Sequence, residues 1–255
     1  MKFFENIEIQ EHPFPHCLVD NFLPPKLFNK IAHELQYQLP PMGSEVWYRY
    51  NNPLENKYAL NDRDFFPETF GKLVAHLETK EFREALATLF HEIELFVPPD
   101  LNGAGIHKIG TGGKLDLHLD HNHTASLPGL ERRINLIYWL HPEWDEEWLG
   151  HLELWKGVEK PEYCHAFIEP KPNRLALFEC GDSSFHGHPD PLECPEGVYR
   201  TSLAMYYYSP ILRDEEERHK VHFYATPNEE YNEELEELRR LRSDPDSSRD
   251  VYRRT

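Results

Sequence analysis

A histidine and two aspartates alternate with leucines in the run Leu115-Asp116-Leu117-His118-Leu119-Asp120. If this run forms a β-strand, its period of two places the leucines on one face and Asp116, His118 and Asp120 on the other. An imidazole and a carboxylate two residues apart can bind one octahedral metal ion from adjacent positions, provided that a second imidazole approaches from elsewhere in the fold. The run therefore predicts half of a metal site.

The second imidazole is expected from the segment Ser183-Ser184-Phe185-His186-Gly187-His188. His186 is the preferred third ligand because it follows the apolar run 175–178 and a Gly-Asp-Ser-Ser turn. His188, His121 and His123 are alternatives, although the last two lie too close in sequence to His118 to approach easily from the opposite side. Two histidines and one carboxylate on one face of a metal form a facial triad that leaves three positions open.

An arginine follows the histidine pair and opens the run Arg200-Thr201-Ser202. On a strand, Arg200 and Ser202 share a face, and a guanidinium beside a hydroxyl suits a carboxylate held by two parallel hydrogen bonds. Asn135 and Trp139 share a face of another predicted strand, over 134–140, where pocket-lining and ordinary core positions are equally expected. The combination of His-x-Asp, a distant histidine and this arginine is far more specific than a His-x-Asp pair alone.

These elements occur in the order of a known family. The motifs are Gly110-Thr111-Gly112-Gly113, His118-Leu119-Asp120, the run from Arg132 to Trp144, Gly150-His151-Leu152-Glu153-Leu154, His186-Gly187 and Arg200-Thr201-Ser202. Together they resemble the 2-oxoglutarate/Fe(II)-dependent oxygenases, specifically their prolyl 4-hydroxylase-like branch, between residues 100 and 210. The resemblance implies a double-stranded β-helix (jelly roll) in which His118, Asp120 and His186 bind Fe(II). It also implies that Arg200, assisted by Ser202, binds the far carboxylate of the cosubstrate 2-oxoglutarate.

The implied reaction consumes O2 and hydroxylates an unactivated C–H bond while 2-oxoglutarate is decarboxylated to succinate. Asp120 favours hydroxylation over halogenation, because related halogenases lack this carboxylate. The expected substrate is a prolyl residue of a peptide or a small aliphatic metabolite, and the run Trp47-Tyr48-Arg49 is a candidate for the substrate side. A non-catalytic metal- or ligand-binding module on the same scaffold is the alternative function.

One position and one short run depart from the family pattern. Lys108 stands ten residues before His118, where many relatives have a tyrosine, and Tyr138-Trp139-Leu140-His141 replaces the usual two tyrosines followed by Leu-Asn. The roles of Lys108 and Asp116 stay open, as does the choice of His186 over His188. The cluster of His118, His121 and His123 is also of a kind that binds Zn²⁺ or Ni²⁺ adventitiously.

The elements that must position these residues are predicted to be mainly β with flanking helices. Short apolar runs separated by glycine and proline after Pro98-Pro99 predict a sandwich or barrel. The stripe Leu27, Ile31, Leu35 predicts a helix, two more are expected over 70–77 and 80–90, and residues 40–65 read as a loop or short hairpin. A C-terminal helix over 228–242 would pack Tyr231, Leu235, Leu238 and Leu241 on one side. We expect one domain over 1–255, with supporting elements in 1–100, the β-helix in 101–212, and a C-terminal helix and tail in 213–255.

Composition limits the partners. The chain has 27 basic and 45 acidic residues, a formal charge of −18, which argues against binding nucleic acid or an anionic membrane. The N-terminus lacks the hydrophobic core of a signal peptide, no long apolar run occurs, and we expect a soluble, cytoplasmic protein with a small-molecule or peptide substrate. The four cysteines form no C-x-x-C pair and should be reduced and mostly buried. The oligomeric state does not follow from the sequence.

Overall fold

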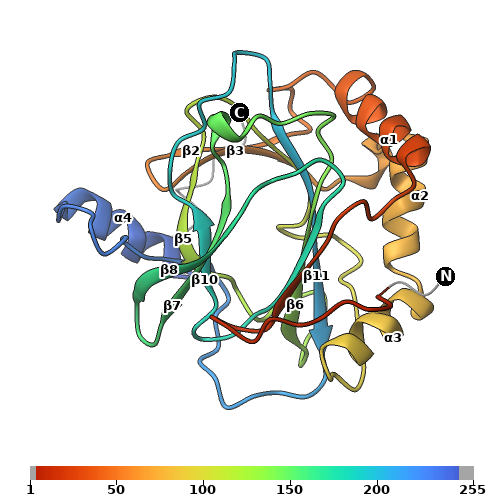
Figure 1. The fold of residues 1–255 in the computed structure, drawn as a ribbon. Helices are drawn as coiled ribbons and strands as arrows, with labels where there is room; N and C mark the ends of the chain where they lie inside the picture. Colours follow the sequence, from red (N-terminus) through yellow and green to blue (C-terminus); the bar gives the residue numbers. More distant parts are fainter. Residues whose placement is uncertain (1–3, 247–255) are drawn as a thin grey trace.

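The computed structural model describes residues 4–246, so the predicted tail beyond Asp246 lies outside the described residues. Within them, twelve strands form one hydrogen-bonded sheet that curls round on itself (Figure 1). The strands are β1 (His16–Val19), β2 (Tyr48–Asn52), β3 (Glu55–Leu60), β4 (Gly105–Ile109), β5 (Leu115–Leu119), β6 (Glu131–Trp139), β7 (Leu152–Gly157), β8 (Pro161–Ile168), β9 (Leu175–Glu179), β10 (Phe185–His188), β11 (Arg200–Ser209) and β12 (His222–Phe223).

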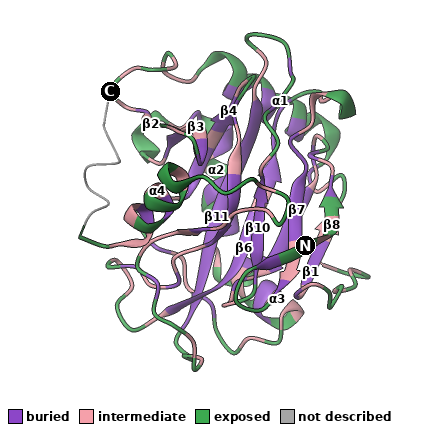
Figure 2. Cartoon of the chain, turned by 90° about the vertical axis from the view of Figure 1, so that its left-hand side faces the viewer, coloured by how far each residue is buried: buried purple, intermediate pink, exposed green. Residues whose placement is uncertain are grey.

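The curled sheet has two walls that face each other. One wall runs in the order β1-β9-β6-β11-β4, the other in the order β5-β10-β7-β8, and β3 joins them by pairing with both β4 and β5. All ten residues of β11 are buried, and Figure 2 shows β6, β10 and β11 buried along their length. This is the predicted double-stranded β-helix, or jelly roll. Strands that precede residue 100, namely β1, β2 and β3, belong to the same sheet.

Three helices, α1 (Pro25–Tyr37), α2 (Glu68–Leu77) and α3 (Lys80–Leu89), cover the outside of the wall that contains β6 and β11 (Figure 1). Their apolar faces join the main core, and Thr79 caps α3 by accepting a hydrogen bond from the Phe82 amide. The predicted stripe of α1 is correct for Ile31 and Leu35 but wrong for Leu27, which is 39% exposed. Phe28 takes its place in the core, because the buried face is turned by one residue.

The alternation of β5 is interrupted, which corrects the prediction that Asp116 shares a face with His118. Between His118 and Leu115 the pairing of β5 with β10 shifts by one residue. An extra residue of this kind reverses the side to which the following side chains point. Leu115 therefore lines the interior with His118, whereas Asp116 lies beside Lys114 and Arg239, with its oxygens 2.7 and 3.8 Å from their respective nitrogens.

The C-terminal helix α4 (Glu233–Ser243) packs differently from the prediction. Tyr231 lies before the helix and is 82% exposed, and the three leucines of the predicted stripe are only half-buried. The side chains that α4 buries fully are Arg239 and Arg242. Both are ion-paired, so α4 is attached to the barrel mainly through buried charges rather than through an apolar face.

Several shorter features complete the fold. The segment 40–65 contains the hairpin of β2 and β3, and the prediction missed the exposed strand β8 at the end of the sheet. All four cysteines are free, and three of them are buried. No helix in the described part of the chain is both long and apolar enough to cross a membrane.

Candidate metal centre

Two histidines and an aspartate converge inside the barrel. His118 of β5 and His186 of β10 are direct cross-strand partners, and their ring centroids are 4.3 Å apart. Asp120 follows β5, with Oδ1 3.7 Å from Nε2 of His118 and Oδ2 3.3 Å from Nε2 of His186. The candidate ligand atoms of all three residues lie within 4.8 Å of one another, so one metal ion can reach them together.

Backbone carbonyls orient both imidazoles. Nδ1 of His118 donates to the carbonyl of Asp116 at 2.9 Å, and Nδ1 of His186 donates to that of Ser184 at 2.8 Å. The protons are therefore on Nδ1, and each Nε2 offers its lone pair to the shared space. Burial, followed by the neighbouring His186, lowers the pKa of His118 to about 3, so this imidazole is neutral at ordinary pH, as a metal ligand must be.

The carboxylate of Asp120 is ionised and fixed. Burial alone would raise its pKa, but Arg132 and the two histidines hold that pKa well below the ordinary value. Oδ2 accepts hydrogen bonds from Nη2 of Arg132 at 2.9 Å and from Nδ2 of Asn135 at 2.6 Å. Two imidazoles and one carboxylate match the donor set of a non-heme Fe(II) site, so the residues present fit this metal.

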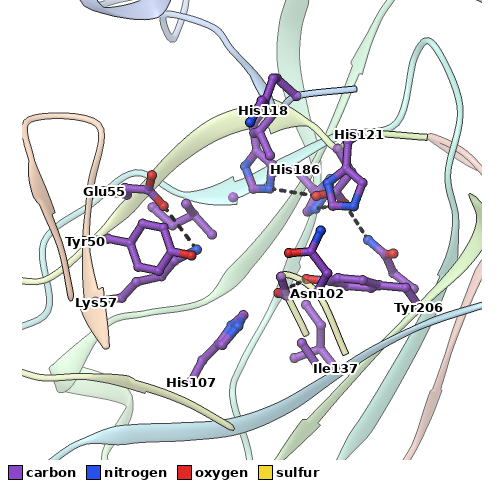
Figure 3. A pocket seen from close by; sticks show the side chains of 18 of the residues that line it. Tyr50, Glu55, Lys57, Asn102, His107, His118, His121, Ile137, His186 and Tyr206 are labelled. Atoms are coloured by element: carbon purple, nitrogen blue, oxygen red, sulfur yellow. Dashed lines mark hydrogen bonds and ion pairs between the residues drawn. The ribbon is translucent and has the colours of Figure 1, made fainter. Parts of the chain in front are cut away.

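The three residues lie in a cavity of about 500 Å³ (Figure 3). Tyr50, Glu55 and Lys57 form one side of it, and His121 and Tyr206 lie on the other side. The remaining polar lining includes Tyr48, Asn102, His107, His123, Arg132, Asn135, His188, Arg200, Ser202, His219, Lys220 and Arg242.

Arg200 lines the same cavity and forms no ion pair with a carboxylate of the described residues. It is 4% exposed, its Nε donates to the carbonyl of Gly150 at 2.8 Å, and its guanidinium carbon is 5.5 Å from the ring of Trp139. Burial lowers its pKa to about 9. Among residues 4–246 no acidic side chain forms an ion pair with it. A buried guanidinium costs free energy unless an anion compensates it, so this end of the cavity fits a ligand carboxylate.

The other predicted site residues take different positions. Ser202 lines the cavity two residues from Arg200, as their shared strand face predicts. Asn135 also lines it, but its amide is bonded to Asp120 rather than directed at a separate ligand. Trp139 is fully buried and packs against the guanidinium of Arg200.

The alternative ligands surround the triad. His188 is 4% exposed, lines the cavity, and has no hydrogen-bond partner on either ring nitrogen. His121 and His123 lie on the wall, where His123 packs against His219 at 5.7 Å between ring centroids. None of them joins the one group within residues 4–246 whose ligand atoms can share a metal, namely His118, Asp120 and His186.

His107 is a lining residue that the sequence reasoning missed. It lies directly opposite Ser202 in the pairing of β4 with β11, and burial lowers its pKa to about 3. Lys108 points to the other face, where its Nζ donates to the carbonyl of Leu35 at 2.8 Å and so ties α1 to the sheet. The alternation of β4 was the available signal, since Lys108 and His107 must face opposite ways.

The aromatic run before the hairpin is divided between core and cavity. Tyr48 lines the cavity together with Tyr50. Trp47 is 1% exposed and belongs to the main core, and the guanidinium of Arg49 lies 4.3 Å from the centroid of the Tyr58 ring. The candidate substrate wall is therefore built by tyrosines of β2.

Comparison with known proteins agrees with this site. The family model of the 2OG-Fe(II) oxygenase superfamily matches residues 104–208. Prolyl 3-hydroxylase OGFOD1 of Mus musculus is 25% identical over 210 residues, which cover 82% of this chain and 35% of that protein. The chain thus spans about a third of the length of this curated relative.

Solved structures share the fold. A prolyl-4-hydroxylase of Pseudomonas putida aligns with a TM-score of 0.52 and 16% identity, covering 76% of this chain and 92% of its own. A 2OG-Fe(II) oxygenase family oxidoreductase of Burkholderia pseudomallei aligns with a TM-score of 0.50 and 14% identity, covering 77% and 86%.

A jelly roll that holds two imidazoles and one carboxylate in its interior is the arrangement of facial-triad oxygenases. Residues 104–208 of the chain are thus similar to the 2OG-Fe(II) oxygenase superfamily, and the solved prolyl-4-hydroxylase shares its fold. The matching family model is that of oxygenases that use Fe(II), 2-oxoglutarate and O2.

Proposed function

We propose that the chain hydroxylates an unactivated C–H bond of a prolyl residue in a peptide or of a small aliphatic metabolite. The observation that carries the proposal is the pairing of two features in one cavity: the cluster of His118, Asp120 and His186, and the buried Arg200 without an ion-pair partner in the described chain. A metal site needs the first feature only. The second supports an enzyme that also binds a dicarboxylate.

Each residue has a proposed role in this reaction. His118, Asp120 and His186 hold Fe(II), which when bound supplies the chemistry that activates O2 for hydroxylation. Arg200 binds the far carboxylate of 2-oxoglutarate through its guanidinium, and the Ser202 hydroxyl beside it donates a further hydrogen bond. Trp139 packs against Arg200 and keeps water from the side of the guanidinium that it covers.

The substrate side is proposed to be the space between the hairpin of β2 and β3 and the wall of His121 and Tyr206 (Figure 3). Tyr48 and Tyr50 offer aromatic rings, which suit an aliphatic ring such as proline, and Asn102 offers an amide for a peptide group. The similarity to a prolyl 3-hydroxylase supports a prolyl substrate over a free metabolite.

Two measurements test the proposal. Anaerobic addition of Fe(II) and 2-oxoglutarate to the metal-free protein should produce a weak visible charge-transfer band. A mass-spectrometric screen of prolyl peptides and small aliphatic metabolites should then find products that have gained one oxygen atom only when 2-oxoglutarate is present. Product formed without 2-oxoglutarate would refute the proposed reaction.

The alternative is a non-catalytic module that binds metal or ligand on the same scaffold. Such a module has no need of a buried arginine beside the metal ligands, so Arg200 argues against it. A wild-type protein that binds Fe(II) but develops no charge-transfer band with 2-oxoglutarate would favour the alternative.

A further inference from the structure

Arg132 and Asn135 form a closed hydrogen-bonded ring with the carboxylate of Asp120. Nη2 of Arg132 and Nδ2 of Asn135 donate to the same oxygen, Oδ2, at 2.9 and 2.6 Å. Nε of Arg132 donates in turn to Oδ1 of Asn135 at 2.7 Å. The amide of Asn135 is thus fixed in one orientation, and Oδ1 of Asp120 accepts none of these hydrogen bonds.

The ring is held rigidly by its surroundings. Arg132 is 1% exposed, and its guanidinium carbon lies 3.3 Å from the centroid of the Tyr206 ring. The hydroxyl of Tyr206 donates to the carbonyl of Gly103 at 2.6 Å, which fixes the ring itself. The guanidinium therefore cannot turn without displacing an aromatic side chain of β11.

Stability alone does not explain this arginine. A buried cation is costly, and Nη1 of Arg132 is buried without a hydrogen-bond partner. A side chain retained only for packing would be apolar at this position, because an apolar residue avoids both costs. The arrangement is instead directed at one atom, Oδ2 of Asp120, which points to a task in the metal centre.

We propose that Arg132, together with Asn135, is a positioning residue that restricts Asp120 to one metal-binding oxygen. The inference rests on the proposed metal site. An octahedral ion with three protein ligands has three positions left, which the two donor atoms of 2-oxoglutarate and O2 would fill. If Asp120 bound through both oxygens, it would occupy one of these positions. Hydrogen bonds that engage Oδ2 prevent this and leave Oδ1 for the ion.

The chain offers a matched set of variants. Arg132→Gln removes the charge and the two-sided fork, and Arg132→Lys keeps the charge but cannot make both hydrogen bonds. Asn135→Ala removes the second donor and leaves Arg132 in place. Arg133→Lys is the control, because Arg133 is equally buried and adjacent but contacts Glu131 and Glu92.

The primary measurement is binding of Co(II), used as the probe metal, to metal-free protein, with its visible absorption recorded before and after 2-oxoglutarate is added. We expect Arg132→Gln to weaken Co(II) binding roughly 10- to 100-fold and to change the absorption of the 2-oxoglutarate complex. Arg132→Lys should recover part of the affinity but not the spectrum, and Asn135→Ala should change both in the same direction. Arg133→Lys should match the wild type in both.

The outcomes separate this inference from the proposed function. Wild-type affinity and spectrum in both Arg132→Gln and Asn135→Ala would overturn the positioning role while leaving the metal site intact. Failure of the wild type to bind Co(II) would instead refute the metal site itself. If Arg132→Gln does not fold, as a thermal melt would show, Asn135→Ala alone decides the question. In steady-state turnover the KM for 2-oxoglutarate should rise more than the KM for the substrate, whereas a general loss of stability would not separate the two.

Discussion

The guanidinium of Arg242 in α4 is ion-paired with the carboxylate of Glu55 in β3, a residue 187 positions earlier in the chain. Both side chains are almost completely buried, at 1% and 3% exposure. Oε2 of Glu55 also lies 3.2 Å from Nζ of Lys57, and all three residues line the cavity. The C-terminal helix is therefore coupled to the hairpin that forms one wall of the candidate active site.

Loss of this ion pair should destabilise the protein. We expect Arg242→Met to lower the free energy of unfolding by about 3 kcal/mol, because it removes one of the two cations that pair with the buried carboxylate of Glu55 within residues 4–246. Urea denaturation measures the change. Arg240→Met is the control on the same helix, since Arg240 pairs with Glu237 on the surface and its loss should leave stability nearly unchanged. Equal effects of the two variants would contradict the role of the buried pair.

Metal binding should distinguish two aspartates that are four residues apart. Asp120→Ala should abolish metal binding and hydroxylation, because it removes the only carboxylate of the cluster. Asp116→Asn should retain both, because Asp116 points away from the cavity toward Arg239. Metal content by atomic absorption and product by mass spectrometry provide the measurements. Full turnover by Asp120→Ala would remove Asp120 from the ligand set.

The affinity for 2-oxoglutarate should depend on Arg200. Arg200→Gln should raise the KM for 2-oxoglutarate on the order of 100-fold, since a buried charged hydrogen-bonded pair is lost. Arg200→Lys should recover only part of this affinity because an ammonium cannot form two parallel hydrogen bonds. Arg174→Gln, which breaks an ion pair with Asp20 outside the cavity lining, should leave that KM unchanged. An Arg200→Gln variant with the wild-type KM would show that the far carboxylate binds elsewhere.

Neighbouring residues of β4 should have separate effects. His107 faces the cavity opposite Ser202, so His107→Leu should raise the KM for 2-oxoglutarate roughly tenfold through a lost hydrogen bond to a charged ligand. Lys108→Met should alter thermal stability but not this KM, because Lys108 is bonded to the carbonyl of Leu35 behind the sheet. Kinetics with 2-oxoglutarate as the varied substrate, combined with thermal melts, test both variants. A raised KM in Lys108→Met and an unchanged KM in His107→Leu would mean that β4 pairs one residue out of register.

Protonation of His141 should destabilise the folded protein in acid. Burial lowers the pKa of His141 to about 3, while an unfolded histidine titrates near 6.5, so the unfolded state binds more protons below that pH. As the pH is lowered from roughly 6 to 4, the free energy of unfolding should therefore decrease more steeply in the wild type than in His141→Gln. The difference between the two slopes should be about 1.4 kcal/mol per pH unit. Urea denaturation at several pH values measures both slopes.

Protonation of Glu179 should increase the free energy of unfolding as the pH falls, which is opposite to the effect of His141. Burial and the nearby Glu92 and Glu215 raise its pKa to about 7, above its ordinary 4.5, so the folded chain binds this proton first. Its contribution to stability grows as the pH falls from about 7 to about 4.5. Glu179→Gln should thus make the acid-induced loss steeper, whereas a shallower slope would show that Glu179 is ionised throughout.

Local patterns were sufficient for most elements and for the ligand types. The apolar stripe of α1, the capping threonine of α3 and the apolar runs of the strands depend on neighbouring residues, and the structure confirms them except at Leu27. His118, His186 and Arg200 were identifiable because their residue types and order are rare in combination. Residue type and spacing carry such information because a strand or helix repeats with a constant period.

The details of the site depend on contacts between distant segments. The shifted register of β5 against β10 turned Asp116 away, and the pairing of β4 with β11 brought His107 beside Ser202. Arg132 reaches Asp120 because the start of β6 lies beside the segment that follows β5, where the Arg132 amide donates to the carbonyl of Asn122 at 2.8 Å. No period within one segment encodes a register shift against a partner strand or a hydrogen bond to another segment. Tertiary pairing therefore decided which polar side chains face the metal centre, because register is a property of two strands at once.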